Sequence, residues 1–234
     1  ETHEKYEIEN LIIVGGESSS ISYEGPTVNE ALSFIKNDFN RESSSLFSGC
    51  IAIPSRKNES KNLLRKSKNG AEFFTTQVLY DSKNIIKMID NYQDLCNSNN
   101  TFPRRILLSF APVSSQKNID FLKWLGVEIP NNTEKYLQAR PGTMTDRSLD
   151  VAIETLNEIH TKMIIELKKL GADIDEINFC PHLPTSKCSC RKPEPQLLLK
   201  AIQKFNIKPE NTIMVGDSYK DMLAAQNAKC HAAL

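Results

Sequence analysis

The sequence predicts an α/β protein assembled from parallel βα units. Short apolar runs alternate along the chain with stretches in which apolar residues recur at helical spacing. Strands that are separated by helices in this rhythm pair in parallel, in an open sheet or a barrel. With 234 residues and 39% apolar content, the chain is long enough for one large domain or two small ones.

In the first part of the chain, the apolar runs 11–14, 50–53, 73–79 and 106–110 are the predicted strands. Each is followed by a predicted helix. Thr27 and Glu30 have the spacing of a capping box at the start of one helix. The next helices are centred on Leu63, on the repeat from Ile85 to Tyr92, and on Ile119 to Leu125, with Gly70 and Gly126 as stop signals.

A long helix follows Pro141-Gly142. Thr145 is its predicted N-cap, and apolar residues recur at helical spacing from Leu149 to Leu170. Beyond it, residues 177–179 and 212–215 are predicted strands, and the second of these ends in Gly216-Asp217. The sequence contains no repeat of fixed period, and Gly15-Gly16 has neither dinucleotide-binding nor P-loop spacing.

Charge and hydropathy narrow the function classes. Lys plus Arg equals Asp plus Glu at 29 each, so no global positive field favours nucleic acid or an anionic membrane. No apolar run approaches the length of about 18 residues expected of a membrane span, and the N-terminus does not resemble a signal peptide. We therefore expect a cytoplasmic protein without nucleic-acid or membrane partners.

The clearest chemical motif is a set of metal-binding residues. Cys180, His182, Cys188 and Cys190 follow a C-x-H-x5-C-x-C pattern. Thiolate and imidazole ligands at this spacing suit one tetrahedral Zn²⁺, and four protein ligands leave no open position. The pattern predicts a structural zinc in a reducing compartment rather than disulfides. The remaining cysteines, Cys50, Cys96 and Cys230, are expected to be small buried apolar residues.

Cations and carboxylates gather around this motif. Arg191 and Lys192 follow the last cysteine directly, and Asp217 and Asp221 follow the predicted strand 212–215. Cations on a metal-pinned loop suit a phosphate group, and carboxylates at a strand end suit Mg²⁺. This part of the chain is therefore expected to bind a small phosphorylated metabolite together with Mg²⁺.

Residues 150–234 resemble the haloacid dehalogenase superfamily, specifically the branch of heptose bisphosphate and histidinol-phosphate phosphatases. The resemblance rests on the zinc loop, the RKPEP that follows it and the string MVGDSYKDMLAAQNAKC. It implies a partial Rossmann-like fold and phosphomonoester hydrolysis. It also implies that Arg191 and Lys192 hold the substrate phosphate, that Asp217 and Lys192 are catalytic, and that Asp217 and Asp221 ligate Mg²⁺.

The nucleophile of that superfamily is the first aspartate of a D-x-D-G-T motif, and this motif does not occur in the chain. Asp173-Ile174-Asp175 has the two acids without the Gly-Thr and is interpreted as a turn. We therefore expect impaired phosphatase activity.

Residues 9–140 resemble methylenetetrahydrofolate reductases of the short bacterial and archaeal type. The strings NLIIVGGESS, GCIAIPS, LLRKSKNGAEFFTTQVLYD and RRILLSFAPVSSQKNIDFLKWLGVEIP carry the resemblance. It implies a partial TIM barrel, an oxidoreductase activity, a folate substrate and a reduced flavin (FAD) or NAD(P)H. By position, Gln77 corresponds to a folate-binding residue, and Glu17, Glu59 and Lys66 correspond to flavin-binding residues.

Each of these four residues also has a structural interpretation. Glu17 suits a solvated loop, and Gln77 suits a strand end whose amide is satisfied by backbone. Glu59 and Lys66 suit a solvated helix face, which is the preferred interpretation for that pair. Because the opening strands of the barrel, with the family's catalytic glutamate, are absent, we expect no competent folate reductase.

The two resemblances predict three segments: a barrel-like part at 1–140, a helical junction at 141–171 and a phosphatase-like part at 172–234. Three interpretations of this organisation remain open. The chain is a natural or engineered chimera that shares one sheet, an assembly of pieces that lacks catalytic parts, or a zinc-containing phosphate-binding module without turnover.

Overall fold

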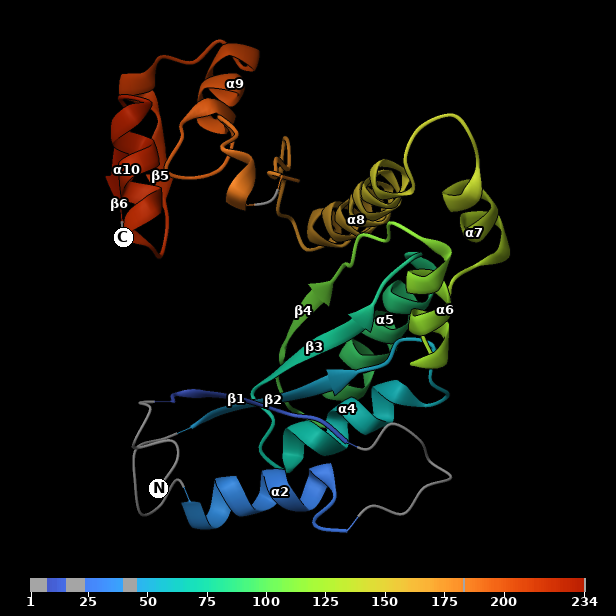
Figure 1. Cartoon of the computed structure of the whole chain (residues 1–234). Coiled ribbons are helices and arrows are strands. Elements are labelled where there is room, and N and C mark those ends of the chain that lie inside the picture. Colours follow the sequence, from blue (N-terminus) through green and yellow to red (C-terminus); the bar gives the residue numbers. More distant parts are fainter. Residues whose placement is uncertain (1–7, 16–23, 40–45, 183, 234) are drawn as a thin grey trace. The chain divides into compact units, whose positions relative to one another are not determined.

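The computed structural model describes residues 8–15, 24–39, 46–182 and 184–233. The chain divides into two compact units, residues 1–166 (unit 1) and residues 167–234 (unit 2) (Figure 1). The dividing point lies inside the predicted junction 141–171. The two units are considered separately below.

Unit 1 contains a four-stranded parallel sheet in the order β1-β2-β3-β4. Its strands are β1 (Asn10–Ile13), β2 (Phe47–Ala52), β3 (Phe73–Val78) and β4 (Arg105–Ser109). All four predicted strands are confirmed, and the parallel pairing follows from the helix that separates each strand from the next. The sheet is the partial barrel-like arrangement that the sequence predicts.

Most helices of unit 1 begin and end close to the predicted signals. They are α2 (Val28–Phe34), the π-helical turn η1 (Ile35–Phe39), α4 (Glu59–Lys68), α5 (Lys83–Ser98), α6 (Gln116–Trp124), α7 (Asn131–Gln138) and α8 (Met144–Lys169). The capping box of Thr27 and Glu30 is present at the start of α2. Gly70 and Gly126 follow their helices with positive φ, which favours glycine there.

Helices α2, α4 and α5 cover one face of the sheet. Alternate strand residues point to that face, where Cys50, Ala52 and Phe74 pack in one apolar cluster with residues of all three helices. A second cluster joins α6, α7 and α8 beyond the strand ends, with Ile119, Leu137 and Val151 among its buried members. The covered face gives unit 1 a continuous apolar core.

Two details of the helices differ from the sequence prediction. Helix α7 was not predicted, because NNTEKYLQ carries few apolar residues and only Leu137 is buried. Thr145 lies inside α8 and is not its N-cap. The hydroxyl of Thr143 accepts the Asp146 amide instead, at 3.1 Å, which is the bond that an N-cap side chain makes.

Unit 2 is smaller and has little sheet. It contains the end of α8, the turns η2 (Pro184–Ser186) and η3 (Pro209–Asn211), α9 (Gln196–Lys204), β5 (Ile213–Val215), α10 (Tyr219–Asn227) and β6 (His231–Ala233). Strands β5 and β6 pair in parallel. The predicted strand at 177–179 is wrong, because those residues form an irregular loop.

None of the helices among the described residues combines the length and apolar character needed to cross a membrane.

Candidate functional site

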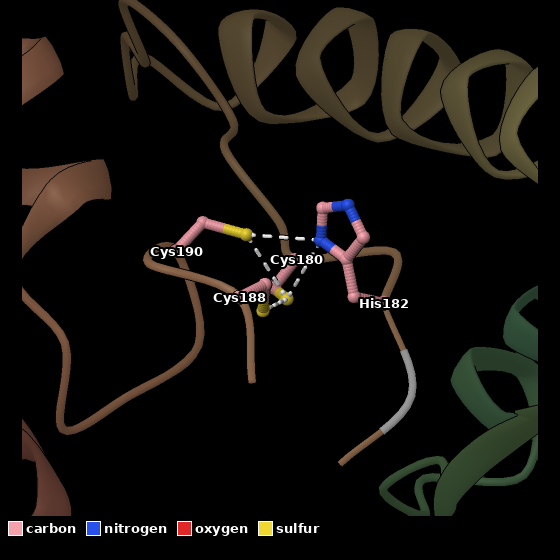
Figure 2. A group of neighbouring side chains, drawn as sticks. All are labelled: Cys180, His182, Cys188 and Cys190. Atoms are coloured by element: carbon pink, nitrogen blue, oxygen red, sulfur yellow. Dashed lines mark hydrogen bonds between the residues drawn. The ribbon is translucent and has the colours of Figure 1, made fainter. Parts of the chain in front are cut away.

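The predicted metal ligands converge in unit 2. One atom from each of Cys180, His182, Cys188 and Cys190 lies within 4.8 Å of the corresponding atoms of the other three (Figure 2). All four come from the loop between α8 and α9, which has little regular structure of its own. This is the one group of three or more candidate metal ligands found among the described residues.

The spacing of these atoms fits a small tetrahedral ion. Cys180 Sγ lies 3.5 Å from Cys188 Sγ and 3.2 Å from Cys190 Sγ, and His182 Nδ1 lies 3.1 Å from Cys190 Sγ. Ligands of a tetrahedral zinc with Zn–S bonds of about 2.3 Å stand roughly 3.8 Å apart, so a small outward adjustment accommodates the ion. Three sulfurs and one imidazole can therefore hold a metal, and they form a closed set.

The thiols of the cluster compete for protons. Desolvation raises the pKa of Cys188, but hydrogen bonds from Cys180 and Cys190 outweigh it and lower that pKa to about 7. The hydrogen bond with Cys180 and desolvation raise the pKa of Cys190 to about 12. Sulfurs packed this closely cannot all ionise without a compensating cation, and metal binding requires thiolates. The close spacing of the three sulfurs therefore suits a shared cation.

A sharp reversal of the chain brings the last two cysteines back to the first. The turn η2 (Pro184–Ser186) is followed by Lys187 with φ of 46°. A non-glycine residue in this left-handed region carries a conformational cost, which surrounding contacts must offset. The Cys/His cluster has members on both sides of Lys187 in the sequence, and the contacts among them can offset this cost.

The two predicted phosphate-binding cations extend directly from this loop. An Arg191 Nη2 donates to the backbone carbonyl of His182, so the guanidinium is anchored to the metal loop. Arg191 Nε is buried and has no hydrogen-bond partner within the described residues. Lys192 Nζ forms an ion pair with Asp221. An ammonium group has three donors, so Lys192 retains two after this contact.

Asp221 is the buried acid of unit 2. Its side chain is 1% exposed, and its Oδ2 accepts the Ser218 hydroxyl at 2.7 Å and the Ser218 amide at 3.2 Å. Together Ser218 and Asp221 form a capping box at the start of α10. The hydrogen bond from Lys192 and that from Ser218 lower the pKa of Asp221. Asp221 is therefore a carboxylate that joins the metal loop to α10.

Gly216 makes room for that carboxylate. A Cβ at position 216 would lie 2.4 Å from Asp221 Cβ, closer than two carbon atoms can approach. Asp217, the other predicted magnesium ligand, comes next in the chain and is exposed. The loop after β5 thus presents Asp217 to solvent while it holds Asp221 inside. Magnesium ligation by either residue stays a prediction.

Glu59 and Lys66 are not on a solvated helix face, as preferred above, but form a buried pair. They are 2% and 8% exposed, and Lys66 Nζ lies 3.7 Å from Glu59 Oε1. Glu59 also accepts the Ile53 amide at 3.1 Å, and Lys66 donates to the Ile51 carbonyl at 2.7 Å. These contacts fasten α4 to the end of β2. Flavin binding by either residue stays a prediction.

The other two predicted residues of the barrel-like part are placed differently. Gln77 lies at the end of β3, where its Nε2 donates to the Leu125 carbonyl at 3.0 Å. This is the backbone-satisfied arrangement that the sequence offered as one interpretation. Glu17 lies outside the described residues. Of the three described positions, Glu59 and Lys66 contact each other, and the Gln77 amide bonds to the Leu125 backbone.

Sequence reasoning missed two residues of the unit 2 site. Gly216 was noted only as the end of a strand. Ser218 was not singled out, although the string GDSYKD contains an S-x-x-D spacing ahead of a helix, which is the signature of a capping box. The ion pair of Lys192 with Asp221 joins residues that are far apart in the sequence, so no local sequence pattern predicts it.

Two family profiles match the chain. The profile described as "Methylenetetrahydrofolate reductase" matches residues 41–170, more than half of the chain. The profile described as "Haloacid dehalogenase-like hydrolase" matches residues 143–234. Both resemblances drawn from the sequence are confirmed, and the two matches overlap over residues 143–170, which include all of α8.

The curated relatives match the second family. A D-glycero-beta-D-manno-heptose-1,7-bisphosphate 7-phosphatase of Neisseria meningitidis is 32% identical over 130 residues, which cover 51% of this chain and 70% of the relative. The Helicobacter pylori protein of the same name is 49% identical over 63 residues, which cover 27% of this chain and 36% of the relative. The chain thus spans only about a third of some of the curated relatives it matches.

A solved structure matches over 66% of this chain and 52% of its own length, with a TM-score of 0.53 and 24% identity. It is described as an uncharacterized protein from Clostridium thermocellum that binds two copies of 5-methyl-5,6,7,8-tetrahydrofolic acid. At this identity the match shows the fold alone. The chain therefore belongs to the methylenetetrahydrofolate reductase family over more than half of its length and, through its C-terminal part, to the haloacid dehalogenase-like hydrolases.

Proposed function

We propose that unit 2 is a zinc-stabilised module that binds a phosphorylated sugar together with Mg²⁺, of the type used by heptose bisphosphate phosphatases. The observation that carries the proposal is the Cys180, His182, Cys188 and Cys190 cluster, which fixes the loop from which Arg191 and Lys192 extend. A structural zinc at this cluster would stabilise that loop, and it leaves no position for catalysis by the metal itself.

The phosphate group would be held by charge-assisted hydrogen bonds. Lys192 retains donors beyond its ion pair with Asp221, and Arg191 Nε is an unpartnered donor within the described residues. Asp217, exposed at the end of β5, is the proposed Mg²⁺ ligand, and Asp221 positions Lys192. Magnesium would supply further positive charge at the phosphate oxygens.

Turnover by this chain is proposed to be at background. Phosphoryl transfer through an aspartyl intermediate needs a carboxylate in line with the phosphorus atom, and the chain has no D-x-D-G-T motif to provide it. Asp217 and Lys192 would then bind without completing the reaction. Robust Mg²⁺-dependent phosphate release that is abolished by Asp217→Asn would contradict this part and make Asp173 and Asp175 the next residues to test.

Calorimetry with heptose bisphosphate in Mg²⁺ tests the binding proposal. Lys192→Ala should weaken binding by about tenfold or more, since a charge-assisted contact contributes on the order of 1.5–3 kcal/mol. Lys208→Ala is a matched control, because Lys208 is exposed and lies outside the metal loop. Equal affinity for the wild type and Lys192→Ala would overturn the proposal.

A second candidate is folate binding by unit 1, favoured by the fold match to a protein described as binding methyltetrahydrofolate. Gln77 would contact the folate, and Glu17, Glu59 and Lys66 would contact a flavin. We propose that the chain nevertheless lacks reductase activity. Gly15 lies where the reductases it resembles have an arginine, and Ile53 lies where they commonly have an aromatic residue that stacks. A yellow protein that oxidises NAD(P)H through a bound flavin would contradict this.

A further inference from the structure

A polar groove runs between α4 and α5 on the surface of unit 1. It encloses about 570 Å³ and is lined by Arg56, Lys57, Ser60, Lys61, Lys87 and Met88, among others. None of the metal or phosphate residues of unit 2 contributes to it. Of the residues assigned above to a flavin or a folate, only Glu59 reaches its lining.

The walls of the groove are fixed by a contact between the two helices. Ser60 is 8% exposed, and its hydroxyl donates to the Met88 carbonyl at 3.0 Å. On the α5 side, the nearly buried Met88 and the half-buried Leu95 are the apolar members of a lining that also contains Asn84, Asn91 and Ser98. The groove therefore has a floor fixed by this hydrogen bond and a lining that is mostly polar on both sides.

Positive charge dominates the rim. Four cationic side chains line the groove, against the two carboxylates Glu59 and Asp94. Glu59 is turned inward, because its oxygens accept from the Ile53 amide and from Asn62 and face Lys66. In the described part of the chain Arg56 pairs with Glu59 at 3.5 Å, whereas Lys57, Lys61 and Lys87 make no ion pair.

This local excess is not a consequence of a basic protein, since the chain as a whole has a formal net charge of zero. The backbone adds to it. Helix α4 begins at the groove after Asn58, which has φ of 62° and makes no side-chain capping bond. The helix start therefore presents partial positive charge on the same side as the lysines.

We infer that the groove binds a small organic phosphate. Lys57, Lys61 and Lys87 would contact the phosphate oxygens, and Leu95 would pack against the organic part. A volume of about 570 Å³ is within the usual range of small-molecule pockets. This ligand site lies in unit 1 and is independent of the phosphate site proposed for unit 2.

Amide chemical-shift titration of the full chain with AMP tests the inference, and adenosine serves as the uncharged control ligand. The amides of Ser60 and Lys87 should shift and saturate with AMP and not with adenosine. The double variant Lys57→Ala/Lys87→Ala should bind AMP roughly tenfold more weakly at low salt, because charge-assisted contacts are removed. Raising the salt concentration should weaken the binding of AMP to the wild-type protein, because salt screens the charges of the lysines and the phosphate.

Two control variants distinguish AMP binding in this groove from a general effect of lysine removal and from binding in unit 2. Lys117→Ala removes an exposed lysine of α6 and should leave AMP binding at α4 and α5 unchanged. Lys192→Ala removes the proposed phosphate contact of unit 2 and should also leave it unchanged. The inference is overturned if Ser60 and Lys87 show no saturable shift, if adenosine binds as well as AMP, or if the double variant binds AMP like Lys117→Ala.

Discussion

Unit 1 and unit 2 are stabilised by different kinds of contact. Unit 1 buries large apolar side chains, among them Leu32, Phe74 and Tyr92, each 1% exposed or less. In unit 2, the buried side chains among the described residues are Ala224, Ala225 and Ala228 together with Asp221. Burial of apolar surface is the main source of folding free energy, so unit 1 has a core of the usual kind and unit 2 has almost none.

Unit 2 replaces apolar burial with cross-links between distant residues. The Cys/His cluster closes the loop between α8 and α9, and the ion pair of Lys192 with Asp221 joins that loop to α10. Meanwhile Ile213 and Val215 of β5 are 62% and 71% exposed. Small domains with too little core depend on metals or disulfides in this way. Metal binding and folding should therefore be coupled in unit 2 and separate in unit 1.

The largest expected effect comes from breaking the metal cluster. Cys188→Ser should unfold unit 2 and leave unit 1 intact, because zinc binding at structural sites contributes on the order of 10 kcal/mol. Two-dimensional NMR of the variant should show unit 2 amides collapsed to random-coil positions. Cys230→Ser, which alters a half-buried cysteine outside the cluster, should keep its native spectrum.

Phe74→Ala tests the apolar core of unit 1. Phe74 is fully buried and packs edge-on against Tyr92, with ring centroids 6.0 Å apart. Removing the ring should lower the unfolding free energy of unit 1 by about 3–5 kcal/mol through lost burial and a cavity. Denaturant melts followed by NMR give the value for each unit. Phe102→Ala is the control, because Phe102 is 91% exposed; a similar loss there would show that the core account is wrong.

The buried pair of Glu59 and Lys66 shows whether unit 1 also depends on polar contacts. Lys66→Met keeps the length of the side chain but leaves the Glu59 carboxylate without its cation at 3.7 Å. Breaking a buried ion pair costs about 3 kcal/mol or more, so unit 1 should be destabilised in denaturant melts. The double variant Glu59→Gln/Lys66→Met should recover part of the loss, and an unchanged single variant would argue against a structural pair.

The smallest expected effect concerns the capping box of α2. Thr27→Ala should cost about 1 kcal/mol of unit 1 stability. The backbone amide of Thr27, followed by its hydroxyl, lowers the pKa of Glu30. Because the folded pKa lies below the unfolded one, this contribution is present above about pH 4.5 and is lost as the pH falls through the folded pKa. Carboxyl NMR titration should show the Glu30 pKa moving part of the way up in Thr27→Ala.

The same difference between the units explains what the sequence could predict. In unit 1 the strands and most helices follow from periodic burial, and the starts and ends follow from residues such as Thr27 and Gly70. Helix α7 was not predicted, because its one buried residue, Leu137, gives no periodic pattern of apolar residues. In unit 2 the metal ligands were predictable because their chemistry is local in sequence, whereas the strand expected at 177–179 failed because a strand also requires a partner strand.

The buried pair of Glu59 and Lys66 in α4 was not predicted for a different reason. Glu59, Leu63 and Lys66 are spaced four and three residues apart, so they lie on one helix face, and Leu63 is fully buried. That spacing was a usable signal that the charged residues share the buried face. Charged residues are rarely buried unless paired, which is why a solvated face was the preferred interpretation. Only the contacts with Ile51 and Ile53 show that the pair fastens α4 to the sheet.

Residue-resolved amide hydrogen exchange, measured on the full chain before and after removal of bound metal by a chelator, tests the central claim most directly. The account predicts about one zinc per chain in the freshly reduced protein. After chelation, α9 and α10 should lose their exchange protection, while β2, β3 and α5 should retain theirs. Protein that contains no zinc and still protects α9 and α10, or a loss of protection in unit 1 equal to that in unit 2, would contradict it.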